Sequence, residues 1–114
     1  MSEKMEDCIF CKLISGEIPS KFIYEDDRVV VFDDLHPKAP VHMLVVPKRH
    51  IPRLMDTVPA DEVLLGHLLE VANKVARERD IAEEGYRVQI NVNRGAGQVV
   101  FHLHLHVMGG HRFA

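Results

Sequence analysis

An alternation of histidine and leucine constrains this chain more than any other feature, because residues 102–106 read His-Leu-His-Leu-His. Successive side chains of a β-strand point to opposite faces, so a strand here presents His102, His104 and His106 on one face and the leucines on the other. The leucines then bind the strand to an apolar core, and the imidazoles are displayed together. The polar face of an edge strand is the alternative, but three histidines in one short apolar strand favour a shared chemical role.

The spacing of these histidines favours separate roles over a three-histidine metal site. At about 3.3 Å per residue, neighbours in the series lie about 6.6 Å apart and the outer two about 13 Å apart. Metal–nitrogen bonds of about 2.1 Å hold two of them easily and all three only with strain. A neutral imidazole can instead attack phosphorus to form a phosphoramidate, while a second imidazole protonates the leaving atom. His104, with an imidazole two residues away on both sides, is the predicted nucleophile.

The remaining patterns predict one α+β domain over residues 1–114. Apolar residues recur at helical spacing over 59–79, where Pro59 suits the first turn of one long helix. A short N-terminal helix over 9–14 should end at Gly16. Apolar runs between turn residues predict an antiparallel sheet of about five strands, over 22–24, 28–32, 42–46, 87–92 and 99–107.

The loop before the last predicted strand, residues 91–98, contains Gly95 and Gly97. Glycines can let main-chain N–H groups converge on phosphate oxygens. Taken alone, such a loop is equally well an ordinary connection between two strands. Its position next to the histidines favours phosphate binding.

Composition limits the partners and the compartment. No apolar run approaches the roughly 18 to 20 residues of a membrane span, and a net charge of -3 argues against broad electrostatic binding to nucleic acid. We therefore expect a soluble, cytoplasmic protein without membrane or nucleic-acid partners. Cys8 and Cys11 form a tight pair in a chain without an export signal, which favours a metal clip or a redox pair over a structural disulfide.

The whole pattern resembles the histidine-triad (HIT) family, whose motif is His-x-His-x-His followed by apolar residues. The similarity runs from Cys8 to Gly110. Its matching segments outside the triad are 16–19, 32–34, 37–42, 47–50 and 85–87. The two glycines after Met108 are similar to the Hint branch. Hint relatives usually have serine where this chain has Val99, so a hydroxyl contact to phosphate is missing.

This resemblance implies hydrolysis of purine nucleoside phosphoramidates, or related nucleoside monophosphate conjugates, by a homodimer without an organic cofactor. His104 would form a covalent nucleotidyl-histidine, and His106 would contact the phosphate and assist the leaving group. Asp34 would bind the ribose hydroxyls, and His42 would support the triad, although a buried structural histidine is an equal alternative. The other implied contacts are a phosphate loop of Asn91, Gly97, Gln98 and Val99 and a base pocket of Phe10, Ile18, Phe32, Leu35 and Leu44, for which core packing is the alternative.

A structural zinc ion is also expected, held by Cys8, Cys11, His50 and His102. The Cys-x-x-Cys spacing lets both thiolates reach one ion, and two histidines complete a closed tetrahedral set without an open position for substrate. Some HIT relatives with the same cysteine pair carry such a zinc, whereas Hint relatives without the cysteines do not. With zinc, His102 stands outside the chemistry. Without it, His50 is an exposed loop residue and His102 belongs to the active site.

Two other functions are compatible with the same residues. A dinucleoside polyphosphate hydrolase would keep every role of the triad and change only the leaving group. A non-catalytic nucleotide-binding or zinc-stabilised regulatory protein would act through a partner. A pure binder does not need a nucleophile, so His104 favours an enzyme.

Overall fold

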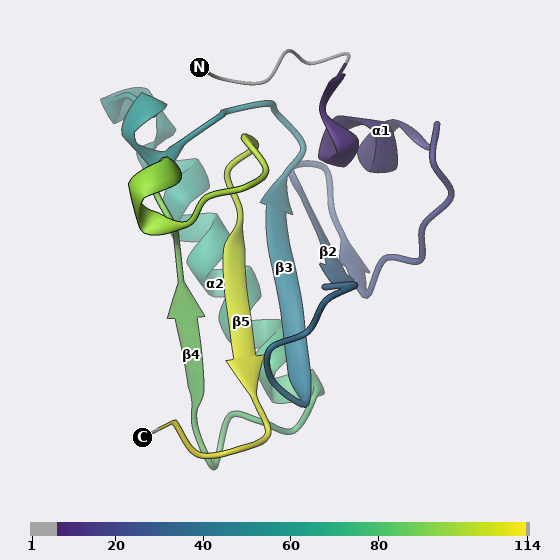
Figure 1. Ribbon diagram of the computed structural model, residues 1–114, viewed down its shortest axis with the longest axis vertical. Helices are drawn as coiled ribbons and strands as arrows, with labels where there is room; N and C mark the ends of the chain where they lie inside the picture. The colour runs from purple at the N-terminus through teal and green to yellow at the C-terminus, as the bar shows by residue number, and fades with distance from the viewer. Residues whose placement is uncertain (1–6, 114) are drawn as a thin grey trace.

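The computed structural model describes residues 7–113, which form a five-stranded antiparallel sheet in the order β1-β2-β3-β5-β4 (Figure 1). The strands are β1 (Tyr24–Glu25), β2 (Val29–Asp33), β3 (Val41–Pro47), β4 (Tyr86–Gln89) and β5 (Leu105–Gly109). The helices are α1 (Ile9–Ser15) and α2 (Glu62–Glu78), and 3-10 turns occur at η2 (Leu54–Asp56), η3 (Pro59–Asp61) and η4 (Arg94–Ala96). The predicted α+β fold, with one long and one short N-terminal helix, is confirmed. Neither helix in this part of the chain has the length and apolar character that crossing a membrane requires.

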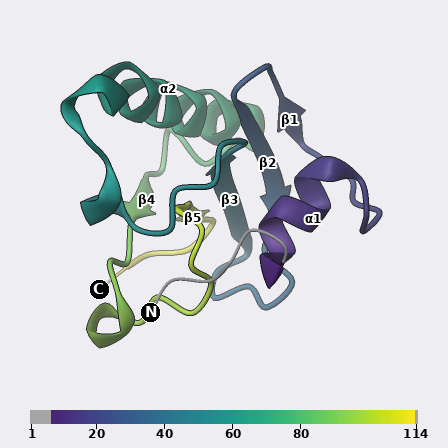
Figure 2. The same cartoon turned by 90° about the horizontal axis from the view of Figure 1, so that it is seen from above.

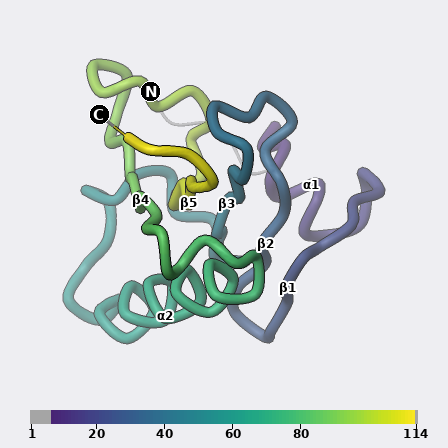
Figure 3. The backbone as a smooth tube through the Cα atoms, turned by 90° about the horizontal axis from the view of Figure 1, so that it is seen from below, coloured from purple at the N-terminus to yellow at the C-terminus, as the bar shows by residue number. Residues whose placement is uncertain are grey.

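The long helix α2 covers one face of the sheet, as Figures 2 and 3 show. Its apolar residues recur at helical spacing and are buried together: Leu68, Val71, Ala72, Val75 and Ala76. They pack on alternate residues of the central strands, namely Val29, Val31, Met43, Val45, Leu105 and Val107. This layer is the main apolar core, and it leaves the other face of the sheet for different contacts.

The short helix α1 lies against that other face, where the sheet presents Val30, Phe32, Leu44 and Val46. Its Phe10 is buried among these residues. Cys8 caps the helix, since its Sγ accepts the N–H of Cys11 at 3.3 Å, and Gly16 ends it with a φ of 85°, as predicted. His106 pairs with Leu44 across the sheet and so lies on the same face. The fold therefore brings the cysteines and the histidines to one side of the sheet.

The last strand is shorter than predicted, and the difference concerns the candidate site. β5 begins at Leu105 rather than at residue 99, so His102 and His104 precede the strand. The N–H of Leu103 donates to the carbonyl of Ile51 at 2.6 Å, a residue outside the sheet. Leu103 and Leu105 still enter the core, and the neighbouring His102 and His104 are buried as well.

Other boundaries move by a few residues. β4 covers 86–89 rather than 87–92, and the predicted helix over 59–79 begins with the 3-10 turn η3 before α2 starts at Glu62. The strand predicted over 22–24 shrinks to Tyr24–Glu25, which pairs with β2 alone at the sheet edge. β3 extends to Pro47, which stands opposite Val29 at the end of the ladder, where a missing N–H disrupts least.

Candidate functional site

His104 is held in the orientation that a nucleophile requires. Its Nδ1 lies 2.7 Å from the carbonyl oxygen of His102, and the side chain is buried except for a small opening. A carbonyl oxygen can only accept, so Nδ1 of the neutral ring carries the hydrogen and donates it. The lone pair is therefore on Nε2. The ring edge of Phe10 packs against the imidazole at a centroid distance of 5.2 Å.

His106 is held in the opposite tautomer by a chain of hydrogen bonds. The main-chain N–H of Lys38 donates to Nδ1 of His42 at 3.0 Å, which places the hydrogen of the His42 ring on Nε2. That nitrogen lies 2.9 Å from Nδ1 of His106 and donates to it. The hydrogen of the His106 ring is then on Nε2. The rings of His104 and His106 are neighbours, with centroids 5.0 Å apart. One site therefore contains the Nε2 lone pair of His104 and the Nε2 hydrogen of His106.

Burial keeps these imidazoles neutral at pH 7. It lowers the pKa of His106 to about 4, with further lowering by repulsion from His104 and His42 when those rings are protonated. Burial also lowers the pKa of His104 and of His42, although the carboxylate of Asp34 opposes the effect at both. A neutral ring has the lone pair that attack on phosphorus needs.

Asp34 comes to the site from the end of β2. Its Oδ2 lies 3.4 Å from Nε2 of His42, and its Oδ1 accepts the N–H of His36 at 2.8 Å. The main-chain N–H of Asp34 donates to the carbonyl of His42, which ties the turn to β3. The carboxylate therefore lies beside the histidines and stays partly open to solvent, with one-fifth of the side chain exposed.

The loop before the histidines uses its polar groups in hydrogen bonds within the protein, whereas the sequence predicted that they bind phosphate. The N–H groups of Gly97 and Gln98 donate to the carbonyls of Arg94 and Asn93, so they are used inside the loop. The side chain of Gln98 is buried, and its amide donates to the carbonyls of Pro52 and Val100 and accepts the N–H of Asn93. Asn91 Oδ1 accepts from Gln89. The groups predicted to bind phosphate thus shape the loop in this structure.

The residues expected around the base divide into two groups. Phe10, Phe32 and Leu44 are buried together, with the rings of Phe10 and Phe32 packed edge to face at 5.4 Å. Ile18 is half-buried, whereas Leu35 is exposed by 89%. Val99, which was expected on the phosphate loop, is exposed by 84%. The buried group joins α1 to His104 through Phe10.

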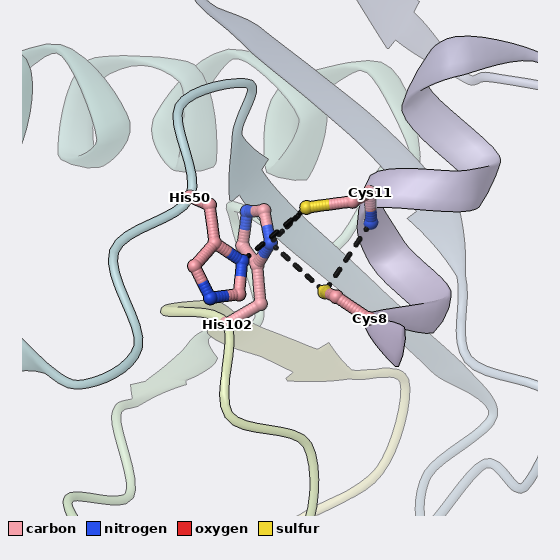
Figure 4. A group of neighbouring side chains, drawn as sticks. All are labelled: Cys8, Cys11, His50 and His102. Atoms are coloured by element: carbon pink, nitrogen blue, oxygen red, sulfur yellow. Dashed lines mark hydrogen bonds between the residues drawn. The ribbon is translucent and has the colours of Figure 1, made fainter. Parts of the chain in front are cut away.

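The four residues predicted to bind zinc converge on one point (Figure 4). Their ligand atoms all lie within 4.8 Å of one another. Nδ1 of His102 lies 3.3 Å from Sγ of Cys8 and 3.6 Å from Sγ of Cys11, and Nδ1 of His50 lies 3.3 Å from Sγ of Cys11. We call these four residues the cysteine-histidine cluster.

Hydrogen bonding shows that this cluster suits a metal ion. Nε2 of His102 donates to the carbonyl of Pro47 at 2.7 Å, which leaves the Nδ1 lone pair facing both sulfur atoms. Burial raises the pKa of the Cys8 thiol to about 12, and a bound cation would reverse that effect by stabilising the thiolate. Nε2 of His50 is buried without a partner among residues 7–113, so no hydrogen bond at that nitrogen selects the tautomer of the ring.

A second group of possible ligands, Asp34, His42 and His106, does not suit a metal ion in the same way. The bond from the Lys38 N–H holds the hydrogen of His42 on Nε2, which is the atom that faces the other two residues. A nitrogen that carries a hydrogen has no lone pair for a metal. This group transmits hydrogen bonds to the triad instead.

Main-chain groups complete the site and were absent from the sequence prediction. The N–H of Lys38 and the carbonyls of Pro47 and His102 select the tautomers of three histidines. Every residue has a main-chain carbonyl, and every residue except proline has an N–H, so no residue pattern reveals them. Pro47 ends β3, because a residue without an N–H cannot donate within a sheet. The end of the strand is the one local sign that the carbonyl of Pro47 is available to a side chain.

Comparison with known proteins places the chain in a family. A model of the HIT domain matches residues 15–113. The purine nucleoside phosphoramidase of Escherichia coli (strain K12) is 46% identical over 105 residues, covering 92% of this chain and 88% of that protein. An uncharacterised HIT-like protein of Synechocystis sp. is 48% identical over 109 residues, covering 96% of this chain and 95% of the relative. A HIT family hydrolase from Clostridium thermocellum has a TM-score of 0.94 at 44% identity, covering 97% of this chain and 96% of that chain. The chain therefore belongs to the HIT family.

Proposed function

We propose that this protein hydrolyses purine nucleoside phosphoramidates, or related nucleoside monophosphate conjugates, through a covalent nucleotidyl-histidine at His104. The observation that carries the proposal is the pair of opposite tautomers: Nε2 of His104 has a lone pair while Nε2 of His106 has a hydrogen. The similarity to the E. coli purine nucleoside phosphoramidase supports this substrate class.

The tautomers support a two-step reaction. Nε2 of His104 attacks phosphorus, the bond from phosphorus to the leaving nitrogen breaks, and His106 gives that nitrogen its Nε2 hydrogen. The hydrogen bond from His42 to Nδ1 stabilises the His106 ring as it loses the hydrogen. Water then attacks phosphorus, releases His104 with a nucleoside monophosphate, and returns a hydrogen to His106.

Trapping the covalent intermediate tests the proposal. We expect wild-type protein, mixed with an adenosine 5′-phosphoramidate and quenched in denaturant, to gain the mass of an adenylyl group on His104. His104→Ala should lose turnover and the adduct but still bind adenosine monophosphate. His36→Ala, which changes an exposed histidine, is the matched control and should behave as wild type. An adduct on another residue, or wild-type protein that binds the nucleotide without turning over the phosphoramidate, would contradict the assignment.

The leaving group separates this proposal from the other hydrolase. Diadenosine polyphosphates offer the same adenylyl phosphorus but a phosphate leaving group, which needs less help from a donated hydrogen. A site that donates a hydrogen accelerates the loss of a nitrogen leaving group more than the loss of a phosphate. We therefore expect side-by-side turnover to favour the phosphoramidate. Faster cleavage of the diadenosine compound would assign the protein to polyphosphate hydrolysis with the same nucleophile.

We also propose that the cysteine-histidine cluster holds one structural zinc ion. The closed set of two thiolates and two imidazoles leaves no position for substrate, so the ion would stabilise the fold and take no part in the reaction. Elemental analysis of protein purified without chelators should give about one zinc per chain. Protein without metal, in which both thiols react freely, would remove zinc from the proposal.

The proposed assembly is a homodimer in the cytoplasm. β4 is an edge strand, so one row of its main-chain groups has no strand beside it within the described chain. A second copy can pair with this edge about a two-fold axis. The cytoplasm would keep both free cysteines reduced.

A further inference from the structure

We infer that the cysteine-histidine cluster positions the nucleophile, because the contacts of Cys8 and Cys11 with the His102 ring fix the carbonyl group that holds His104. This inference rests on the proposed function and deepens it, since it gives the cluster a part in the reactivity of the same site. His102 becomes a positioning residue that acts through its main chain.

The strand does not supply this positioning. β5 begins at Leu105, so the main chain at His102 and His104 lies outside the sheet ladder. Within this short segment, Leu103 makes a main-chain bond, to the carbonyl of Ile51. The direction of the His102 carbonyl therefore depends on how the His102 side chain is held.

The His102 side chain is held from two sides. It is fully buried, its Nδ1 contacts both sulfur atoms, and its Nε2 donates to the carbonyl of Pro47 at 2.7 Å. These contacts oppose rotation of the ring and, with it, movement of the residue. The carbonyl of the same residue then stays 2.7 Å from Nδ1 of His104.

Phe10 provides a second connection between the cluster and the nucleophile. It lies between the two cysteines in the sequence, and its ring packs edge to face on His102 at 5.8 Å and on His104 at 5.2 Å. A shift of α1 that follows loss of a cysteine contact would move this ring as well. Both connections lead from the thiols to the imidazole of His104.

Loss of the cluster should therefore change the chemical step more than nucleotide binding. Without a fixed carbonyl, the hydrogen of His104 divides between its two nitrogens, and a ring with hydrogen on Nε2 has no lone pair for phosphorus. The carboxylate of Asp34 and the His42 chain contact other elements and keep their positions.

Cys11→Ser tests the inference, since Cys11 is only half-buried and serine preserves the shape of the side chain. We expect the rate of adenylyl transfer to His104 at saturating phosphoramidate to fall about tenfold or more, with adenosine monophosphate affinity within about twofold of wild type. Nitrogen NMR of labelled histidine should show the Nδ1–H tautomer of His104 in wild type and a mixture in the variant.

Tyr86→Phe is the matched control, because it removes the bond from Tyr86 to Asn73 on the other side of the sheet and so lowers stability without touching the cluster. It should keep both the rate and the tautomer. If Cys11→Ser keeps the wild-type rate and tautomer, the cluster is purely structural and the inference is wrong.

Two further measurements keep the test decisive. If Cys11→Ser does not fold, methylthiolation of Cys11 in folded wild-type protein also removes the thiol that contacts His102, and reductant should restore the tautomer. If wild-type protein turns over no phosphoramidate, the proposed function fails. The NMR comparison still decides the positioning role, which an unchanged tautomer would overturn.

Discussion

We expect the single side chain of Asp34 to connect nucleotide recognition to the histidine chain. Its Oδ1 accepts one main-chain N–H and its Oδ2 faces His42, yet the carboxylate remains partly exposed and can accept further hydrogens. Two neighbouring hydroxyl groups of a ribose are suitable donors. Asp34→Ala should weaken binding of adenosine monophosphate by about 1.5–3 kcal/mol, the range for a hydrogen bond to a charged group.

The dideoxy analogue supplies the control for this substitution. It lacks both hydroxyl groups, so calorimetry should give nearly the same affinity for wild type and Asp34→Ala. Equal losses with the two ligands would show that Asp34 acts on the site only through His42.

The pH dependence follows from the direction of the histidine pKa values. Burial, and then the charges of His104 and His42, lower the pKa of His106 to about 4, and burial lowers that of His104 below its usual 6.5. Attack needs neutral His104, so kcat/KM should stay level as the pH falls through 6.5 and decline only at lower pH. A decline centred at or above 6.5 in the pH–rate profile would show that His104 is not shielded.

The same shifts predict how stability depends on pH. Between about pH 6.5 and 4, these buried histidines bind more protons in the unfolded chain than in the folded one. The free energy of unfolding should therefore be largest above 6.5 and fall as the pH is lowered through this window. Urea denaturation at a series of pH values measures this dependence.

At the scale of elements, patterns that repeat were predictable and positions that depend on distant contacts were not. The helix α2 and the strand β3 follow from apolar residues at helical spacing and from an uninterrupted apolar run. The start of β5 was wrong by six residues because the segment 99–104 bonds to Ile51 and Gln98 rather than to a neighbouring strand. The alternation of histidine and leucine cannot show that the main chain of this segment bonds outside the sheet.

The candidate site shows the same division. The triad and the two cysteines were recognisable by residue type and spacing, and His50 was expected through the family resemblance; the structure brings the four cluster residues together. The roles of Lys38 and Pro47 were not recognisable, since they lie in main-chain groups that fold contacts alone bring to the histidines. Gln98, predicted to contact phosphate, has its whole amide committed to the loop.

Gln98 should therefore act on binding through the loop. Gln98→Ala removes three hydrogen bonds that join Asn93, Val100 and Pro52, and should cost about 1–3 kcal/mol of folding free energy. Amide hydrogen exchange over 93–100 should become faster, and nucleotide affinity should fall with it.

Gln89→Ala is the matched control, because this glutamine on β4 makes one side-chain bond, to Asn91, and lies outside the loop. It should leave exchange over 93–100 unchanged. If Gln98→Ala weakens nucleotide binding without faster exchange, the side chain contacts the nucleotide directly, as the sequence predicted.

At the scale of the whole molecule, the sheet separates stability from chemistry. The face beneath α2 is a continuous apolar core, whereas the other face carries α1, the histidines and the cysteines. Substitutions on the α2 face should chiefly affect folding, and substitutions of His104 and His106 on the other face should chiefly affect the reaction.

The homodimer prediction concerns the edge at β4, where Val88 is partly exposed among main-chain groups that have no strand beyond them in the described chain. Further exposed apolar side chains, Val58, Val63 and Leu69, lie at the start of α2 and along it. Pairing of two β4 strands would cover this edge, and two arginines facing each other there would repel. Light scattering after size exclusion should show a dimer for wild type and for Val88→Thr, which keeps the β-branched shape, and a folded monomer for Val88→Arg. A dimer that survives Val88→Arg would place the interface away from β4, and a monomeric wild type at micromolar concentration would refute the homodimer itself.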